Sequence, residues 1–342
     1  MTRVAVVLFN LGGPDRLEAV EPFLRNLFYD PAIVRLPAPM RWILARLIAH
    51  RRGPVARDIY RQIGGASPIR ANTEAQAAAL QEVLGGDFRV FVAMRHWHPF
   101  SAETAAAVKA WSPERILLLP LYPQFSTTTT RSSYRAWKKA VDAVGLAVPT
   151  RLLCCYPTDT GFAAAIAEPL RRALEEMPPS TRVLFSAHGL PQKIVDAGDP
   201  YPWQVQRSVD AVRTALGRDC EAVICYQSRV GPLQWLEPSI DAEIRRAGAV
   251  RRPLIVVPIA FVSEHSETLV ELDRDYRRLA DEVSVPSYRR LATVGTAPLF
   301  IAGLARLVRE MLGQEPGTGT ADGKRLCPSD YRDCPYSTGT CG

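Results

Sequence analysis

The sequence RVLFSAHGLP, at residues 182–191, decides the class of fold. Its first five residues form a short, mainly apolar stretch, which is typical of a strand buried on both faces of a parallel sheet. Gly189 and Pro191 prevent the strand from continuing, so we expect His188 at its carboxyl end. Open α/β sheets bind their ligands at that edge. The stretch therefore predicts an α/β protein with a histidine placed where ligands bind.

Similar apolar runs recur along the chain and alternate with helical patterns. The other runs begin near residues 4, 89, 115, 148, 222 and 254. Between them, stretches such as 71–84 and 163–177 repeat apolar residues every three or four positions, as helices do. Strands that alternate with helices predict parallel sheets built from βαβ units, with about four strands in each half of the chain.

The length of 342 residues, with 47% hydrophobic and 23% charged residues, is that of a globular protein with more than one domain. We expect an N-terminal domain over 1–149, which includes an apolar lip, and a C-terminal domain over 150–314. Residues 315–342 should form a linker and a cysteine-rich tail. The stretch 315–326 is rich in glycine and threonine, and the tail has too little apolar material to fold alone.

The charge balance excludes a typical nucleic-acid-binding protein. The 42 basic and 35 acidic residues give a net charge of +7, but the basic residues are scattered and form no stripe with aromatic side chains. Weak attraction to anionic ligands or membrane surfaces is expected. The N-terminus lacks the features of a signal peptide, and no apolar stretch approaches the roughly 20 residues of a membrane span. We therefore expect a cytoplasmic protein that can contact a membrane peripherally.

Three carboxylates follow the last long apolar run. Glu267, Glu271 and Asp275 are spaced by four residues, so a helix would present them on one face. A charge run of this kind usually forms ion pairs at the surface. Its position directly after a buried strand instead places its first turn at the sheet edge where His188 is expected. A histidine that faces carboxylates can bind a divalent metal or transfer protons near neutral pH. His265 and His98 are better interpreted as structural residues.

Two further segments suit a flat, apolar ligand that carries carboxylates. Residues 36–52 mix apolar residues such as Met40 and Ile43 with arginines, which indicates either an ordinary buried helix or an amphipathic lip. Residues 120–137 contain a run of hydroxyl residues, which helix capping and strand propensity partly explain. Nearby arginines and aromatic residues can bind a carboxylate-bearing ring system.

Nucleotide binding has little support. The glycines at 12 and 13 directly follow the first predicted strand, where a phosphate-binding turn would stand. The GxGxxG pattern is absent because Pro14 and Asp15 follow, and there is no Walker lysine.

Eight motifs, taken together, identify a resemblance to a known family. They are NLGGP at 10, YRQIGGASPI at 60, RHWHP at 95, LYPQFSTTTTRSS at 121, FSAHGLP at 185, GDPYPWQV at 198, QSRVGPLQWL at 227 and PIAFVSEHSETLVELD at 258. The chain resembles the ferrochelatases from about residue 4 to residue 312, in order and without large gaps.

The resemblance implies two similar Rossmann-like domains, each a four-stranded parallel sheet flanked by helices, with a porphyrin cleft between them. It implies that Fe(II) enters protoporphyrin IX with loss of two pyrrole protons, which is the terminal step of haem biosynthesis. His188 and Glu267 would be catalytic, and with Glu271 and Asp275 they would form the metal-binding or proton-relay row. Residues that match porphyrin-binding positions are Leu11, Met40, Ile43, Tyr60, Arg95 and Tyr122. His96 stands where relatives often carry tyrosine.

The tail offers three thiols, Cys327, Cys334 and Cys341, spaced by seven residues. An iron–sulfur cluster or structural zinc usually needs four ligands, and the adjacent Cys154 and Cys155 on a predicted strand could supply the fourth. Some ferrochelatases hold a [2Fe–2S] cluster with C-terminal cysteines and one internal cysteine, and this chain resembles them. It departs from the animal pattern because Thr127 occupies the position of the internal cysteine. Zinc or free thiols remain alternatives.

Three other functions stay open at this point. A chelatase could act on another tetrapyrrole, such as coproporphyrin, or on another metal. The same fold could carry porphyrin or haem without reacting. A nucleotide-binding α/β protein would be stabilised by its nucleotide.

Overall fold

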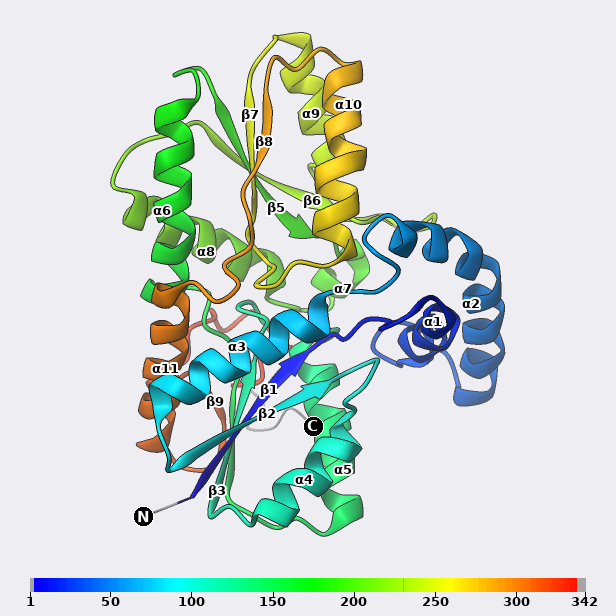
Figure 1. Ribbon diagram of the computed structural model, residues 1–342, viewed down its shortest axis with the longest axis vertical. Coiled ribbons are helices and arrows are strands. Elements are labelled where there is room, and N and C mark those ends of the chain that lie inside the picture. Colours follow the sequence, from blue (N-terminus) through cyan, green and yellow to red (C-terminus); the bar gives the residue numbers. More distant parts are fainter. Residues whose placement is uncertain (1–2, 230, 337–342) are drawn as a thin grey trace. The chain divides into compact units, whose positions relative to one another are not determined.

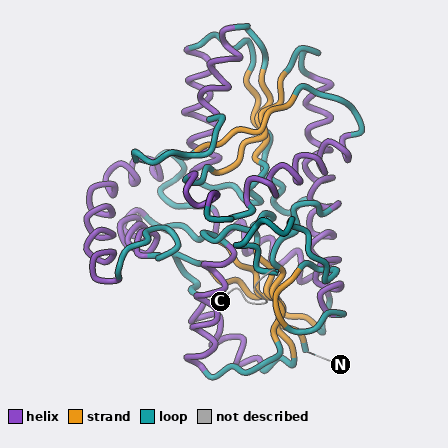
Figure 2. Tube along the Cα trace, turned by 180° about the vertical axis from the view of Figure 1, so that it is seen from behind, coloured by secondary structure: helices purple, strands orange, loops and turns teal. Residues whose placement is uncertain are grey.

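The computed structural model describes residues 3–229 and 231–336. The chain forms two parallel sheets flanked by helices, which confirms the predicted α/β class (Figures 1 and 2). Within the described residues, the first compact unit comprises 3–155, 305–326 and 335–336, and the second comprises 156–304 and 327–334.

The first sheet has five strands in the order β2-β1-β3-β4-β9, and the second has four in the order β6-β5-β7-β8. The strands of the first sheet are β1 (Val4–Asn10), β2 (Phe88–Met94), β3 (Arg115–Pro120), β4 (Thr150–Leu153) and β9 (Gly317–Gly319). Those of the second are β5 (Arg182–His188), β6 (Ala222–Gln227), β7 (Leu254–Pro258) and β8 (Tyr288–Arg290).

Helices connect the strands, as the alternating pattern predicts. In the first unit they are η1 (Leu17–Ala19), α1 (Val20–Tyr29), α2 (Ala38–Arg61), α3 (Ile69–Leu84), α4 (Ser101–Trp111) and α5 (Thr130–Val144). In the second they are α6 (Thr160–Glu176), α7 (Gln192–Asp196), α8 (Tyr201–Leu216), α9 (Ile240–Ala249), η2 (Glu267–Asp275) and α10 (Tyr276–Glu282). The last helix, α11 (Pro298–Leu312), spans the point where the chain returns from the second unit to the first.

Burial of apolar strands explains why the sheets form. Every residue of β1 and of β7 is buried, as expected for strands covered by helices on both faces. The register aligns the carboxyl ends of neighbouring strands: Asn10 pairs with Met94 in the first sheet, and His188 pairs with Gln227 in the second. Residues that directly follow these strands therefore gather at one edge of each sheet.

The structure differs from the sequence-based expectations at the end of the first sheet. Strand β4 pairs with β3, so residues 150–153 belong to the first sheet, although we expected the boundary before them. The expected linker contains β9, which pairs in parallel with β4. Arg151 holds the segment around β9 against β4, because its guanidinium donates hydrogen bonds to the carbonyls of Glu315 and Thr320 at 2.7 and 2.9 Å.

The described part of the tail packs against the second unit around the start of α8. The backbone N–H of Asp333 donates to the carbonyl of Gly198 at 3.2 Å, and the rings of Trp203 and Tyr331 lie 6.0 Å apart. These contacts order the described part of the tail, which has too little apolar material to fold alone. Among the described residues, no helix has the length and apolar character needed to cross a bilayer.

Candidate active site

His188 ends strand β5, as the sequence predicts. The backbone N–H of Gly189 donates to the carbonyl of Gln227 at 2.9 Å, and a Cβ at Gly189 would lie only 2.8 Å from that oxygen. Glycine therefore allows β5 and β6 to approach each other where the histidine leaves the sheet. About a third of the His188 side chain, 38%, is exposed.

The acidic row lies on η2, which is a π-helix rather than the α-helix we expected. The backbone N–H of Tyr276 donates to the carbonyl of Glu271, five residues earlier, which is the π-helical pattern. Side chains that contact helix carbonyls favour such distortions, and the amide of Gln227 donates to the carbonyl of Glu267 at 3.2 Å. π-Helical turns are rare and often occur at functional sites.

The carboxylate of Glu267 lies between two histidines. Its Oε2 is 2.9 Å from Nδ1 of His188 and 3.6 Å from Nε2 of His265. Nδ1 of His265 lies 3.0 Å from the carbonyl of Ser263, so this nitrogen carries the proton and Nε2 faces the carboxylate. The three side chains form one charge-coupled group at the carboxyl edge of the second sheet.

The group shifts the pKa of each member. Burial raises the pKa of Glu267, but the two histidines outweigh burial and hold the pKa well below its ordinary value. Burial lowers the pKa of His188, whereas the charge of Glu267 and the hydrogen bond to it prevail and raise the pKa above its ordinary value. The pKa of His265 is raised in the same way: burial lowers it, and its contact with Glu267 outweighs burial.

Glu271 is the second member of the acidic row that joins this network. Its Oε2 accepts hydrogen bonds from the hydroxyl of Ser228 at 2.6 Å and from the amide of Gln227 at 3.3 Å. The hydroxyl of Ser186 donates to Oε1 of Gln227 at 2.7 Å, which turns the amide nitrogen toward Glu271. Burial and the charge of Glu267 raise the pKa of Glu271 to about 7. A carboxyl group with that pKa can both accept and release a proton near neutral pH.

Asp275 lies apart from this network. Half of its side chain, 51%, is exposed, and Oδ1 is 3.8 Å from the guanidinium of Arg278. This surface ion pair matches the ordinary interpretation of the charge run, at the far end of the row.

Three of the residues matched to porphyrin-binding positions lie where strands of the first sheet end. Leu11, Arg95 and Tyr122 follow β1, β2 and β3, respectively. Arg95 is firmly held: its Nη2 is 2.8 Å from Oδ2 of the buried Asp30, and its Nε donates to the hydroxyl of Ser132 at 2.6 Å. The phenol of Tyr122 is buried, and burial raises its pKa. A neutral phenol and a fixed guanidinium therefore share this edge.

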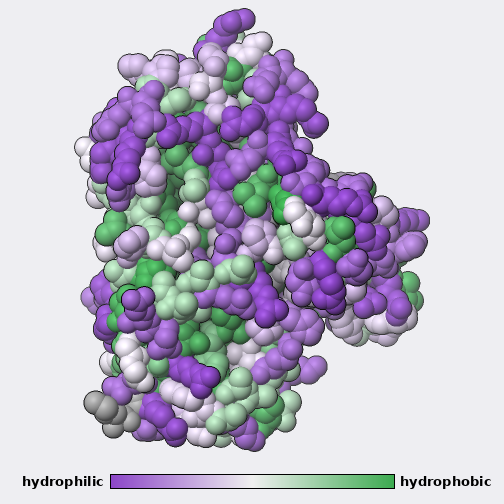
Figure 3. Space-filling model, viewed as in Figure 1, coloured by the Kyte–Doolittle hydropathy of each residue, from purple (hydrophilic) through white to green (hydrophobic). Residues whose placement is uncertain are grey.

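The other three residues of that set lie on α2. Tyr60 is buried in an apolar cluster with residues of α1, whereas 56% of Met40 and 62% of Ile43 are exposed. Trp42 and Leu47 are also largely exposed, so α2 is not the ordinary buried helix that the pattern allowed. Figure 3 shows isolated hydrophobic residues within the mostly hydrophilic surface of α2.

His96 is fully buried in the same region as Asp30, and its Nε2 lies 3.8 Å from Oδ2 of that residue. Burial and the neighbouring Arg95 hold the pKa of His96 well below its ordinary value. The ring is therefore neutral.

The described residues include four of the cysteines expected to bind a metal cluster. Cys154 and Cys155 follow the end of β4 rather than lying on it, and their Sγ atoms are 3.5 Å apart. The prediction that both cysteines lie on a strand is therefore wrong. Cys327 and Cys334 are buried in the second unit, and the amide of Gln204 donates to Sγ of Cys327 at 3.1 Å. Cys341 lies outside the described residues.

Sequence reasoning missed three residues of the site. His265 resembled a structural histidine, and only the fold brings it to Glu267. Gln227 ends β6 and Ser228 follows it, in a stretch of sequence that resembles ordinary core. A polar pair at the end of a strand that neighbours β5 was the available signal, because such residues gather at the ligand-binding edge.

Comparison with known proteins agrees with the family resemblance of the sequence motifs. The family model described as Ferrochelatase matches residues 3–312. The ferrochelatase of Caulobacter vibrioides is 49% identical over 344 residues, which cover 98% of each chain. That of Phenylobacterium zucineum is 51% identical, over 98% of this chain and 99% of its own, and that of Rickettsia bellii is 44% identical, over 97% and 94%.

Solved structures share the fold at low sequence identity. The cobalt complex of the sirohydrochlorin chelatase SirB from Bacillus subtilis subspecies spizizenii superimposes with a TM-score of 0.54 at 11% identity, over 92% of this chain and 99% of that one. The family match over nearly the whole chain and the closely related sequences lead to one conclusion: the chain belongs to the ferrochelatase family, the enzymes that insert metal into porphyrin.

Proposed function

We propose that the protein inserts Fe(II) into protoporphyrin IX to form protohaem, the terminal step of haem biosynthesis. Two pyrrole N–H bonds break, two protons leave, and the ferrous ion forms bonds to all four nitrogens of the resulting porphyrin dianion. The observation that carries the proposal is the contact of Glu267 with His188 and His265, beside a second carboxyl group whose pKa is about 7.

These residues suit the proton transfers that the reaction requires. Pyrrole protons leave only if a base stands within hydrogen-bond reach of the ring, and an imidazole is a suitable base near neutral pH. Nδ1 of His188 is tied to Glu267, so its Nε2 is the atom that accepts a pyrrole proton. Glu267 stabilises the resulting imidazolium, and Glu271 receives the proton onward. The same carboxylates attract the ferrous ion, a substrate that favours imidazole and carboxylate ligands. Asp275 would extend the row to the surface.

We propose that the macrocycle contacts Leu11, Tyr60, Arg95 and Tyr122, with Met40 and Ile43 of α2 as an apolar lip. The fixed guanidinium of Arg95 would attract the propionate side of the porphyrin. The exposed apolar residues of α2 are also suited to a bilayer surface, since they alternate with arginines. A cytoplasmic location with peripheral contact to the inner membrane stays a prediction.

Anaerobic titration tests the proposal. The purified protein is mixed with protoporphyrin IX and Fe(II), and the Soret and visible bands are followed against a control without protein. We expect conversion to haem bands at a rate well above that control. A bound but unchanged porphyrin spectrum would identify a carrier, and faster conversion of coproporphyrin would reassign the substrate.

We further propose that the tail cysteines and one of Cys154 and Cys155 bind a [2Fe–2S] cluster. The described residues alone do not assemble the ligand set, because no three histidine, cysteine or acidic side chains among them form a metal-holding group. Support comes from the chemistry of the donors: Cys327 and Cys334 are buried, and a hydrogen bond from Gln204 is the kind of contact that stabilises a thiolate ligand.

If the protein binds a [2Fe–2S] cluster, it should be brown, absorb visible light, and contain iron and acid-labile sulfide in equimolar amounts. Cys327→Ser should lose both, whereas Cys220→Ser, at a partly exposed position, should retain both. Zinc without sulfide, or a colourless protein with reactive thiols after anaerobic purification, would contradict the proposal.

A further inference from the structure

Arg290, on the edge strand β8, contacts both segments that carry the histidine–carboxylate group. Its Nη1 donates to Oε1 of Glu264 at 2.6 Å, and its Nε donates to Oδ1 of Asp273 at 2.9 Å. Nη2 contacts the second oxygen of Asp273, so this pair is bidentate. Only 9% of the Arg290 side chain is exposed. One planar group thus joins a loop to the π-helix.

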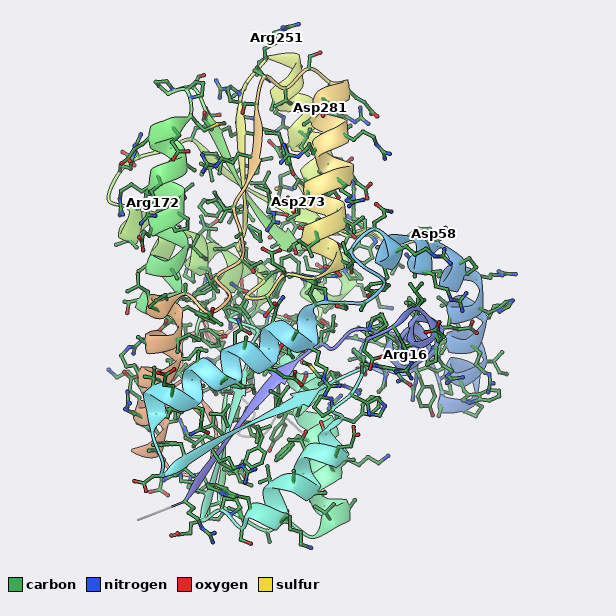
Figure 4. The ribbon with its side chains drawn as sticks, viewed as in Figure 1. Arg16, Asp58, Arg172, Arg251, Asp273 and Asp281 are labelled. Carbon is green, nitrogen blue, oxygen red and sulfur yellow. The ribbon has the colours of Figure 1, made fainter. Side chains whose placement is uncertain are left out.

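The two carboxylates are close in sequence to the reacting groups. Glu264 directly precedes His265, and Asp273 lies on η2, the helix that carries Glu267 and Glu271. Figure 4 labels Asp273 on the side of this helix that faces β8. Oε1 of Glu264 also accepts the backbone N–H of Thr293 at 2.8 Å, so the loop is fixed to the chain that follows β8.

The anchor itself is rigid. Arg290 pairs with Val256 in the ladder between β8 and β7, and β7 lies next to β5, which ends in His188. The position of the guanidinium is therefore set by the same sheet that positions His188. A bidentate arginine fixes orientation as well as distance, which a lysine cannot do.

We propose that Arg290 is a positioning residue for metal insertion: it holds the loop at Glu264 and the π-helix at Asp273 so that His265 and Glu267 keep their alignment with His188. This inference rests on the proposed function. Displacement of a reacting group by about 1 Å can cost on the order of a hundredfold in rate. Loss of Arg290 should therefore lower kcat while it leaves the porphyrin-contact residues of the first unit unaltered.

The test compares Arg290→Gln with Arg289→Gln. Arg289 is the preceding residue on the same strand and also forms an ion pair, with Glu176 at the surface. We expect Arg290→Gln to lower kcat by about 10- to 100-fold, with KM for porphyrin changed by less than about threefold. Arg289→Gln should change neither value. Because loss of one partner leaves two carboxylates uncompensated, Arg290→Gln/Asp273→Asn provides a charge-balanced second variant.

Histidine resonances supply a readout that does not depend on activity. The chain has five histidines, and His50, His96 and His98 belong to the first unit. Long-range ¹H–¹⁵N spectra at fixed pH should show shifts of the His188 and His265 rings in both Arg290 variants, with the other three unmoved. Unchanged ring resonances, or an unchanged kcat in folded variants with a lower Tm only, would overturn the positioning role. If the native protein inserts no metal, the proposed function fails, and the spectra still decide whether Arg290 aligns the rings.

Discussion

His188→Ala is expected to lower the rate of iron insertion by about 10²- to 10⁴-fold, the usual contribution of a general base. Among the described residues of the second unit, the imidazole is the group that combines a raised pKa, a carboxylate partner and substantial exposure. Alanine removes the proton acceptor and leaves the residues matched to porphyrin contacts in place. Porphyrin binding, measured by fluorescence quenching, should therefore change little.

His98→Ala is the matched control for this experiment. His98 also contacts a glutamate through Nδ1, at 2.9 Å from Oε2 of Glu103, but at an exposed position of the first unit. Its replacement should leave the insertion rate unchanged. Equal loss of activity in the two variants, or near-native activity in His188→Ala, would contradict the role of His188.

Glu267→Gln is expected to have the second-largest effect, a loss of about a hundredfold or more in kcat. The amide has the size of the carboxylate, but it neither stabilises the imidazolium nor fixes the proton on Nδ1 of His188. In the serine-protease triad, replacement of the orienting carboxylate by an amide costs about 10⁴-fold in kcat. The effect here should be at least about a hundredfold, the lower end for proton-transfer catalysis.

The control for the carboxylate is Glu103→Gln, in the exposed pair with His98. Stopped-flow measurements at saturating porphyrin and iron would separate kcat from binding. Glu271→Gln should cost less than Glu267→Gln, since Glu271 contacts Ser228 and Gln227 rather than a histidine. If Glu271→Gln proved the more damaging change, the proton would enter the carboxylate row at Glu271 and not at His188.

The sequence predicts the larger part of the fold because the strands are buried on both faces. A run such as residues 182–186 has to lie inside a sheet, and the glycine after His188 has to end it. Parallel register then brings the segment after β7 to the same edge. The meeting of His188 with Glu267 is therefore predictable from local pattern and sheet topology alone.

Features that depend on distant partners could not be predicted in the same way. Strand β9 contains only Gly317–Gly319, and Arg151 docks the adjoining chain from 164 residues away. The π-helix depends in part on an amide from β6, and nothing in the spacing of its carboxylates distinguishes it from an α-helix. The contact of His265 with Glu267 has no signal in the sequence. It depends on the orientation of the ring, which the hydrogen bond between Nδ1 of His265 and a backbone carbonyl fixes.

The strand order of the second sheet has an evolutionary consequence. His188, Gln227 and Glu267 come from β5, β6 and the segment after β7, which are three adjacent strands of one unit. On the proposed function, the proton-accepting groups His188, Glu267 and Glu271 lie within one stretch of chain and would be inherited together. The residues proposed to contact the macrocycle lie in the first unit, so substitutions there would change which macrocycle is recognised without altering the proton transfers.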